Sequence, residues 1–341
     1  MNTPYFRPIV QRNVQRSRSA VALAGGPLWF DHVCVMQRDE APHVISASDL
    51  PSHVLDSLSG SRPSISDLSF DRPRIMAILN ATPDSFSDGG QFFDPKHAVA
   101  QARQFMEDGA DILDIGGEST RPGSQEVPVD EEIKRTRPIM EALCGQLDGK
   151  AGAMLSSDTR KAKVAEMALE CGAGLINDVS GFTFDPQLAP LCAERKAAVC
   201  VMHSQGLPDT MQDNPRYENV VLDVFDTLEV KINELVDLGI PRSRIIADPG
   251  IGFGKTIDHN LAILQNISVF HNLGVVLMLG VSRKGFIGKV TDEPNAMRRA
   301  FGSVSTALAA AAQGVQIFRV HDVKETRQAF DMWQILESGK T

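Results

Sequence analysis

Polar and charged residues directly follow most of the short apolar runs of this sequence. In chain order these residues are Asn80, residues 116–123, Asp158, residues 177–178, His203, Asp248, residues 282–284 and residues 319–322. A barrel or sheet needed only for stability would have little reason to place such groups at one run end after another. The pattern indicates an enzyme or a specific binding protein.

The residue types divide into two complementary sets. Cationic and hydrogen-bond-donating side chains suit phosphate or carboxylate oxygens, and they are Lys284, Arg319, His321 and Arg121. Acceptor side chains suit the N–H and amino groups of a heterocycle, and they are Asp158, Asn177 and Asp248. A site that contains both sets would bind a polar, nitrogen-rich ring that carries an anionic group.

Several of these residues also have a purely structural interpretation. The alternatives are a helix N-cap for Asp158, an Asx-turn for Asn177 and Asp178, turn chemistry before Pro83 for Asn80, a satisfied rim histidine for His203, and solvated rim charges for Lys284 and Arg319. These alternatives stay open for each residue taken alone. If all the residues lie at the same end of one barrel, a shared functional site becomes the better explanation.

The elements that would carry these residues alternate regularly from residue 73 onward. The apolar runs are 75–79, 112–115, 153–155, 174–176, 198–202, 245–247, 275–279 and 317–320. Most are apolar throughout, which is typical of parallel strands buried on both faces. The helical candidates are 96–108, 129–144, 160–171, 186–195, 220–238, 259–272, 293–313 and 323–337. Eight such units predict an α/β fold of the (β/α)8 TIM-barrel type, since a doubly wound sheet typically needs only about five or six strands.

Composition narrows the class of partner. The 341 residues carry 34 Lys and Arg against 43 Asp and Glu, a net charge of -9. This balance argues against nucleic acid as a partner but permits an anionic small molecule in a local basic pocket. The long uncharged stretch 300–318 is Ala-rich, so we expect a buried helix leading into a strand and no membrane partner. The five widely spaced cysteines predict reduced thiols and a cytoplasmic location.

The glycine-rich segment 248–256 looks at first like a phosphate loop. The G-x-x-x-x-G-K-[ST] pattern requires glycine at position 249, which is Pro249, and the G-x-G-x-x-G pattern fails at Lys255. The glycines therefore predict a tight turn or a close approach of the backbone to a ligand. Zincin, serine-hydrolase and calcium-loop motifs do not occur in the sequence.

The first part of the chain reads differently from the rest. Residues 1–72 are rich in Pro, Ser and Arg, and residues 57–69 resemble a Ser-rich linker. The early arginines suggest a targeting segment, but the apolar run 20–24 is too short for a secretory signal. We therefore expect an N-terminal extension over 1–72 with a few short strands, followed by a catalytic barrel over 73–341.

Two long motifs resemble the signatures of dihydropteroate synthases. They are ILNATPDSFSDGG at 78–90 and DIGGESTRPG at 114–123, and shorter matches follow at 157–159, 176–178, 202–203, 248–250, 282–284 and 319–322. The resemblance covers residues 73 to about 335 in the expected order. It departs at Ala81, where the family usually carries valine, and at Gly285, where it often carries a serine near the second substrate.

The resemblance implies a folate-pathway transferase, the enzyme that sulfonamides block. It would condense 6-hydroxymethyl-7,8-dihydropterin pyrophosphate with p-aminobenzoate to form 7,8-dihydropteroate and pyrophosphate. The family fold is a (β/α)8 barrel, usually a homodimer, and the reaction uses Mg2+. Loss of pyrophosphate would leave a methylene cation on the pterin, which the arylamine attacks without a covalent enzyme intermediate.

The resemblance also implies a division of the site. The pterin ring would contact Asp158, Asn177, Asp248, Phe253 and Lys284; pyrophosphate would contact Asn80, Arg319 and His321; Mg2+ would be held by Asn80; and p-aminobenzoate would contact Phe86, Thr120, Arg121 and Pro122. Within this set the catalytic residues would be Asp158, Lys284, Arg319 and His321. The loops 82–93 and 118–127 would close over the bound pterin.

Two other functions fit a pterin-binding barrel. One is a folate-dependent methyltransferase that passes a methyl group to a corrinoid, and it would not need the Ser-Thr-Arg-Pro-Gly loop or the Arg319–His321 pair. The other is a pterin-binding paralogue without turnover. Pyrophosphate release that depends on p-aminobenzoate would distinguish the synthase from both.

Overall fold

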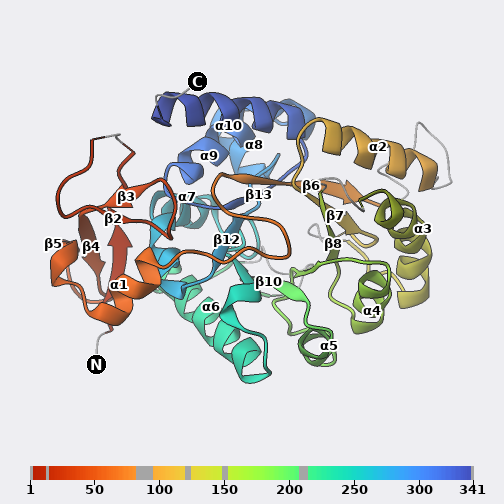
Figure 1. Ribbon diagram of the computed structural model, residues 1–341, viewed down its shortest axis with the longest axis horizontal. Coiled ribbons are helices and arrows are strands. Elements are labelled where there is room, and N and C mark those ends of the chain that lie inside the picture. The colour runs from red at the N-terminus through yellow and green to blue at the C-terminus, as the bar shows by residue number, and fades with distance from the viewer. Residues whose placement is uncertain are drawn as a thin grey trace.

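The computed structural model describes residues 3–12, 15–81, 95–119, 124–147, 153–206 and 214–338. Eight parallel strands form a closed barrel in the order β10-β11-β12-β13-β6-β7-β8-β9, with helices around it (Figure 1). The strands are β6 (Arg74–Asn80), β7 (Ile112–Gly116), β8 (Met154–Asp158), β9 (Leu175–Asp178), β10 (Ala198–Met202), β11 (Ile245–Asp248), β12 (Val276–Leu279) and β13 (Ile317–Val320). The predicted (β/α)8 fold class is confirmed.

The helices follow the strands with one correction to the expected pattern. They are α2 (Pro95–Glu107), α3 (Val129–Leu147), α4 (Ala162–Glu170), α5 (Leu188–Glu194), α6 (Val220–Asp237), α7 (Ile257–Gln265) with the 3-10 segment η4 (Ile267–Leu273), α8 (Gly285–Thr291), α9 (Ala300–Ala311) and α10 (Val323–Ser338). The helix predicted over 293–313 begins later, as α9 at Ala300, because Asp292 has a φ of 54°, Pro294 follows it, and a short 3-10 turn precedes Ala300. A further helix, α8, lies before this break and was not predicted.

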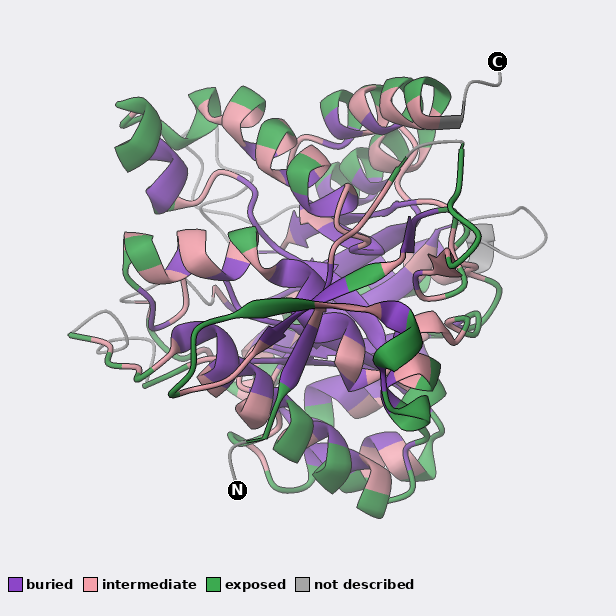
Figure 2. Cartoon of the chain, turned by 90° about the vertical axis from the view of Figure 1, so that its left-hand side faces the viewer, coloured by how far each residue is buried: buried purple, intermediate pink, exposed green. Residues whose placement is uncertain are grey.

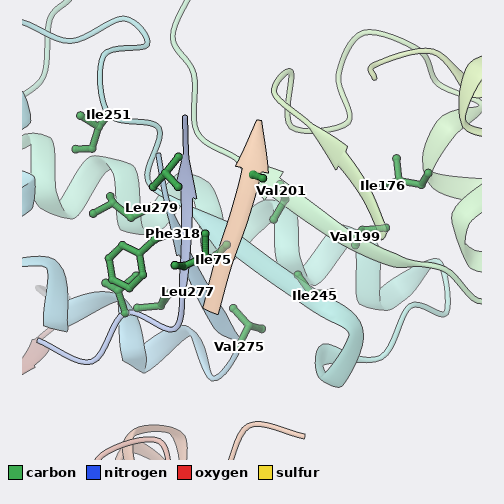
Figure 3. Packing of buried hydrophobic residues seen from close by; sticks show 14 of the residues in the cluster. Ile75, Ile176, Val199, Val201, Ile245, Ile251, Val275, Leu277, Leu279 and Phe318 are labelled. Carbon is green, nitrogen blue, oxygen red and sulfur yellow. The ribbon is translucent and has the colours of Figure 1, made fainter. Parts of the chain in front are cut away.

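Alternation along the strands creates two apolar layers. Outward-facing side chains such as Ile75 and Phe318, which are register partners on β6 and β13, pack between the barrel and the helices (Figure 3). Inward-facing side chains such as Met76, Ile112 and Cys200 fill the barrel interior. Burial is accordingly concentrated in the central strands, while the outer faces of the helices are exposed (Figure 2).

The N-terminal segment forms a small layer against one side of the barrel wall (Figure 1). It contains an antiparallel sheet, a two-stranded hairpin and a helix, namely β1 (Tyr5–Pro8), β4 (His32–Met36) and β5 (His43–Ser46), then β2 (Val21–Ala22) with β3 (Trp29–Phe30), and α1 (Ser52–Ser59). Its own apolar cluster includes Phe30 and Leu58. Trp333 of α10 packs against both this cluster and the main core, so it joins the two.

Polar contacts fix the segment to the wall. Arg38 donates to Asp223 at 2.5 Å and to Asp226 at 2.6 Å, both on α6. The Tyr5 hydroxyl also donates to Asp226, at 2.6 Å. Just before the barrel, Ile65 and Leu68 pair in a tight turn. Their apolar side chains join the cluster inside the barrel and cover its end at the amino termini of the strands.

Among the described residues, no helix is long and apolar enough to cross a membrane. The uncharged stretch 300–318 is divided between α9 and β13, as expected for a buried helix followed by a strand.

Candidate active site

A cavity of about 1320 Å³ opens at the carboxyl ends of the barrel strands. This volume exceeds the ~300–1,000 Å³ usual for one small ligand. Of the twelve residues that the resemblance assigns to the site, the structure brings eight into this lining, namely Asn80, Asp158, Asn177, Asp248, Phe253, Lys284, Arg319 and His321. The other four, Phe86, Thr120, Arg121 and Pro122, lie outside the described residues.

A buried aspartate that the sequence reasoning missed holds two of these residues. Asp114 lies in the middle of β7 and is fully buried. Its Oδ2 accepts hydrogen bonds from Arg319 Nε at 2.6 Å and from Asn177 Nδ2 at 3.0 Å, and its Oδ1 accepts from Ser156 Oγ at 2.6 Å. Because the Asn177 amide turns its nitrogen to Asp114, its carbonyl oxygen is left as the atom that can accept from a ligand.

Asp158 combines an ion pair with an unpartnered oxygen. Its Oδ2 accepts from Arg319 Nη2 at 2.6 Å. Its Oδ1 is buried and has no hydrogen-bond partner among the described residues. Burial raises the pKa of Asp158 to about 7, the Arg319 charge opposes this shift, and the Asp114 carboxylate adds to it. A buried acceptor without a partner is costly, so this oxygen points to a ligand that donates an N–H.

Asp248, which ends β11, and Lys284, in the loop between the neighbouring strand β12 and α8, both line the cavity. Asp248 Oδ1 accepts from the Gly250 amide at 2.7 Å. Burial raises the pKa of this carboxyl, and the Lys284 charge opposes the shift. Lys284 donates to the Ile251 carbonyl, and its Nζ lies 4.6 Å from the centre of the Phe253 ring. Burial lowers the pKa of Lys284 to about 8, with Asp248 opposing that shift.

His321 and Asn80 complete the part of the lining around Arg319. The ring Nδ1 of His321 lies 3.0 Å from Ser282 Oγ, and the His321 backbone amide donates to the same oxygen at 3.1 Å. Asn80 ends β6 and lines the cavity together with both residues.

Other strand-end residues have structural roles. Asp178 accepts from the Ser180 and Phe182 amides, both at 2.7 Å, so the turn interpretation holds for Asp178 and not for its neighbour Asn177. Asp322 pairs with Arg283. His203 is buried and lies against Lys255, whose Nζ is 2.8 Å from the His203 Nδ1. Burial and the Lys255 charge lower the pKa of His203 to about 3, so its ring is neutral.

A buried ionic cluster supports the loop that follows β7. Lys161 lies between Glu118 and Glu132, donating to both, and it also donates to the Val127 carbonyl at 2.6 Å. Thr159 donates to Glu132 at 2.8 Å. The two ends of the 118–127 loop are therefore fixed to the start of α4.

The cavity lining contains a protein oxygen donor of the kind that Mg2+ uses. Among the described residues, no group of three or more His, Cys, Asp or Glu side chains is placed to hold a metal ion. Mg2+ usually takes one or two protein oxygens together with substrate phosphates. The Asn80 amide oxygen, in the same lining as Arg319 and His321, fits that mode.

The sequence profile of the family described as pterin binding enzyme matches residues 76–321. The chain is 44% identical over 275 residues to a dihydropteroate synthase of Neisseria meningitidis serogroup B, covering 79% of this chain and 95% of that protein. A Xanthomonas albilineans dihydropteroate synthase solved with 4-aminobenzoic acid superposes with a TM-score of 0.74 at 42% identity, covering 80% and 95% of the two chains. The same organism's enzyme in complex with 7,8-dihydropteroate gives 0.72 at 39% identity, covering 80% and 96%.

Proposed function

This chain belongs to the family of pterin-binding enzymes and catalyses the dihydropteroate synthase reaction, and on that basis we propose which residues of its site bind each part of the substrates. The reaction joins 6-hydroxymethyl-7,8-dihydropterin pyrophosphate to p-aminobenzoate and releases pyrophosphate. The observation that carries the assignment of the ring site is the buried, unpartnered Oδ1 of Asp158, which lines the same cavity as Asn177, Asp248 and Lys284.

The pterin ring binds among these four residues and Phe253. The ring presents N–H and amino donors, which the oxygens of Asp158, Asn177 and Asp248 accept. Lys284 donates to a ring acceptor from the opposite side, and Phe253 packs next to its ammonium group. Asp114 keeps Asn177 and Arg319 in place beneath the ring.

The pyrophosphate lies toward Asn80, Arg319 and His321. Arg319 already uses Nε and one Nη2 proton on Asp114 and Asp158, so the two Nη1 protons and the second Nη2 proton are those it can offer to the phosphate oxygens. The Asn80 amide oxygen would hold Mg2+, which when bound would supply positive charge that stabilises the leaving group. Arg319 and His321 add donors to the same oxygens.

The p-aminobenzoate binds next to the pterin methylene, contacting Phe86, Thr120, Arg121 and Pro122. Ser119, which directly precedes Thr120, and Gly285 both line the cavity. A Cβ added to Gly285 would meet nothing within 4 Å, which leaves room for a ligand at this point.

The chemical step needs charge stabilisation and alignment. The bond between the methylene carbon and the pyrophosphate oxygen breaks, and the electron pair leaves with pyrophosphate. The Asp158 carboxylate stabilises the positive charge that develops on the pterin. The neutral arylamine nitrogen then bonds to the methylene carbon and loses a proton to solvent, so no enzyme nucleophile is required.

We further infer a homodimer that works in the cytoplasm. Large apolar side chains are exposed on and between α8 and α9, namely Val290 at 61%, Met297 at 66% and Phe301 at 91%. Such a surface is typical of a subunit interface. All five cysteines are free, as expected in a reducing compartment. Light scattering should find a dimer in the wild type and a monomer in Phe301→Glu, and a wild-type monomer would refute the dimer.

The assay that tests the function measures pyrophosphate release with both substrates and Mg2+. The wild type should turn over only when p-aminobenzoate is present, and Lys284→Ala should lose about a hundredfold or more in kcat/KM. Lys163→Ala, which changes an exposed lysine of α4, is the matched control and should not differ from wild type. Pterin binding without turnover would contradict the synthase assignment.

A further inference from the structure

Lys255, the lysine of the glycine-rich segment 248–256, forms its hydrogen bonds with other groups of the protein. Lys255 is 3% exposed. Its Nζ contacts the Gly250 carbonyl at 2.9 Å, the Phe253 carbonyl at 3.0 Å and His203 Nδ1 at 2.8 Å. An ammonium group uses its three protons on these partners, and a neutral amine would use two protons and its lone pair. In both states no hydrogen-bonding position is left for a phosphate.

The partners of Lys255 belong to two different strand ends. Gly250 and Phe253 lie in the loop after β11, and His203 follows β10. The two segments are pressed together, because a Cβ on Gly250 would lie 1.8 Å from the His203 carbonyl oxygen, and Gly250 has a φ of +67°. Lys255 therefore links the two segments where their backbones are already in contact.

The linked loop supplies the surroundings of the pterin residues. The Gly250 amide donates to Asp248 at 2.7 Å, and the Ile251 carbonyl accepts from Lys284. The Phe253 ring lies beside the same ammonium group. The two carbonyls that Lys255 holds, of Gly250 and Phe253, flank the carbonyl that orients Lys284.

We propose that Lys255 is a positioning residue for the pterin substrate: by tying the β11 loop to His203 it fixes the orientation of Asp248, Phe253 and Lys284. This inference rests on the proposed function, because it assigns the affected residues to the pterin. It predicts that loss of the Lys255 contacts weakens recognition of one substrate and leaves the other unaffected.

The test compares the two Michaelis constants in Lys255→Met. The KM for the pterin pyrophosphate should rise about tenfold or more, since buried partners lose their hydrogen bonds. The KM for p-aminobenzoate should stay within about twofold of wild type. Lys255→Gln, which keeps two N–H donors, should recover part of the loss. Lys231→Met is the control, since it removes a 2.8 Å contact between a lysine and the Gly181 carbonyl in a different loop.

Calorimetric binding of the pterin pyrophosphate without p-aminobenzoate separates this inference from the function itself. A synthase whose Lys255 variants bind the pterin as tightly as wild type would overturn the positioning role. Equal increases of both KM values, or a lower melting temperature with unchanged KM values, would overturn it as well. If the methionine variant does not fold, the glutamine variant and His203→Gln carry the same comparison. A wild type that binds the pterin but does not turn over refutes the function and leaves the binding comparison valid.

Discussion

Ionisable side chains with little contact to water surround the cavity. The carboxyls of Asp114, Asp158 and Asp248 are buried, and the charges of Arg319 and Lys284 lie among them. Burial favours the neutral forms, raising the pKa of Asp158 to about 7 and lowering that of Lys284 to about 8. Because these two pKa values lie close together, the free enzyme has a narrow pH range in which both groups are charged. A bound ligand that donates to Asp158 and accepts from Lys284 would favour both charged forms.

The alkaline side of that range depends on Lys284. A lowered lysine pKa means that the ammonium is present below about pH 8 and lost above it. The value of kcat/KM for the pterin pyrophosphate, which reports the free enzyme, should therefore fall as the pH rises through about 8. In Lys284→Arg the plateau should be lower, but this decline should disappear, because a guanidinium does not titrate in the range. A decline that stays at the same pH in the variant would show that another group causes it.

At the scale of elements, the strands were predictable because both of their faces are buried, so apolar runs mark them. Polar residues at or shortly after the ends of these runs then indicated much of the cavity lining, including Asp158 and Arg319. Asp114 was missed because it lies inside its strand, although the two-residue alternation from Gly116 points it inward. Lys255 was considered only as part of a phosphate-binding motif, so its contacts within the protein were not predicted. α8 was missed because it is short and begins with Gly285.

The loop after β7 depends on the cluster around Lys161. Lys161→Met would leave Glu118 and Glu132 buried without their cation. Breaking such a buried pair typically costs about 3–5 kcal/mol, so the free energy of unfolding measured with urea should fall by that amount. Arg195→Met removes an exposed pair with Glu166, whose side chains are 40% and 47% exposed, and should change stability by less than about 1 kcal/mol. Similar small effects in both variants would contradict a supporting role for the cluster.

At the scale of the whole molecule, the chain is a catalytic barrel with a second small core on its wall. About four fifths of this chain aligns with its relatives, and this part covers nearly the full length of each relative. Most of the N-terminal segment therefore has no counterpart in these relatives. Among the described residues, the cavity lining begins at Ile78 and includes none of that segment. Its contacts with α6, η4 and α10 indicate a stabilising role.

Stability and activity should therefore separate in this segment. Arg38→Met loses two short ion pairs to α6 and should lower the free energy of unfolding by about 1–2 kcal/mol, since the group is partly exposed. The kcat/KM values for both substrates should remain those of the wild type. Arg12→Met removes a 3.2 Å pair of a half-exposed arginine with Glu337 and should have almost no effect on either property. Reduced activity in Arg38→Met would indicate that the segment acts on the site.

Because Trp333 packs against both apolar clusters, its fluorescence should be sensitive to their separation. The chain has two tryptophans, and the other, Trp29, lies in the N-terminal hairpin. Neither lines the cavity. Indole fluorescence will therefore follow the attachment of the N-terminal layer, while far-ultraviolet circular dichroism is dominated by the barrel helices. An emission change that precedes the loss of ellipticity during denaturation would show the layer detaching from an intact barrel.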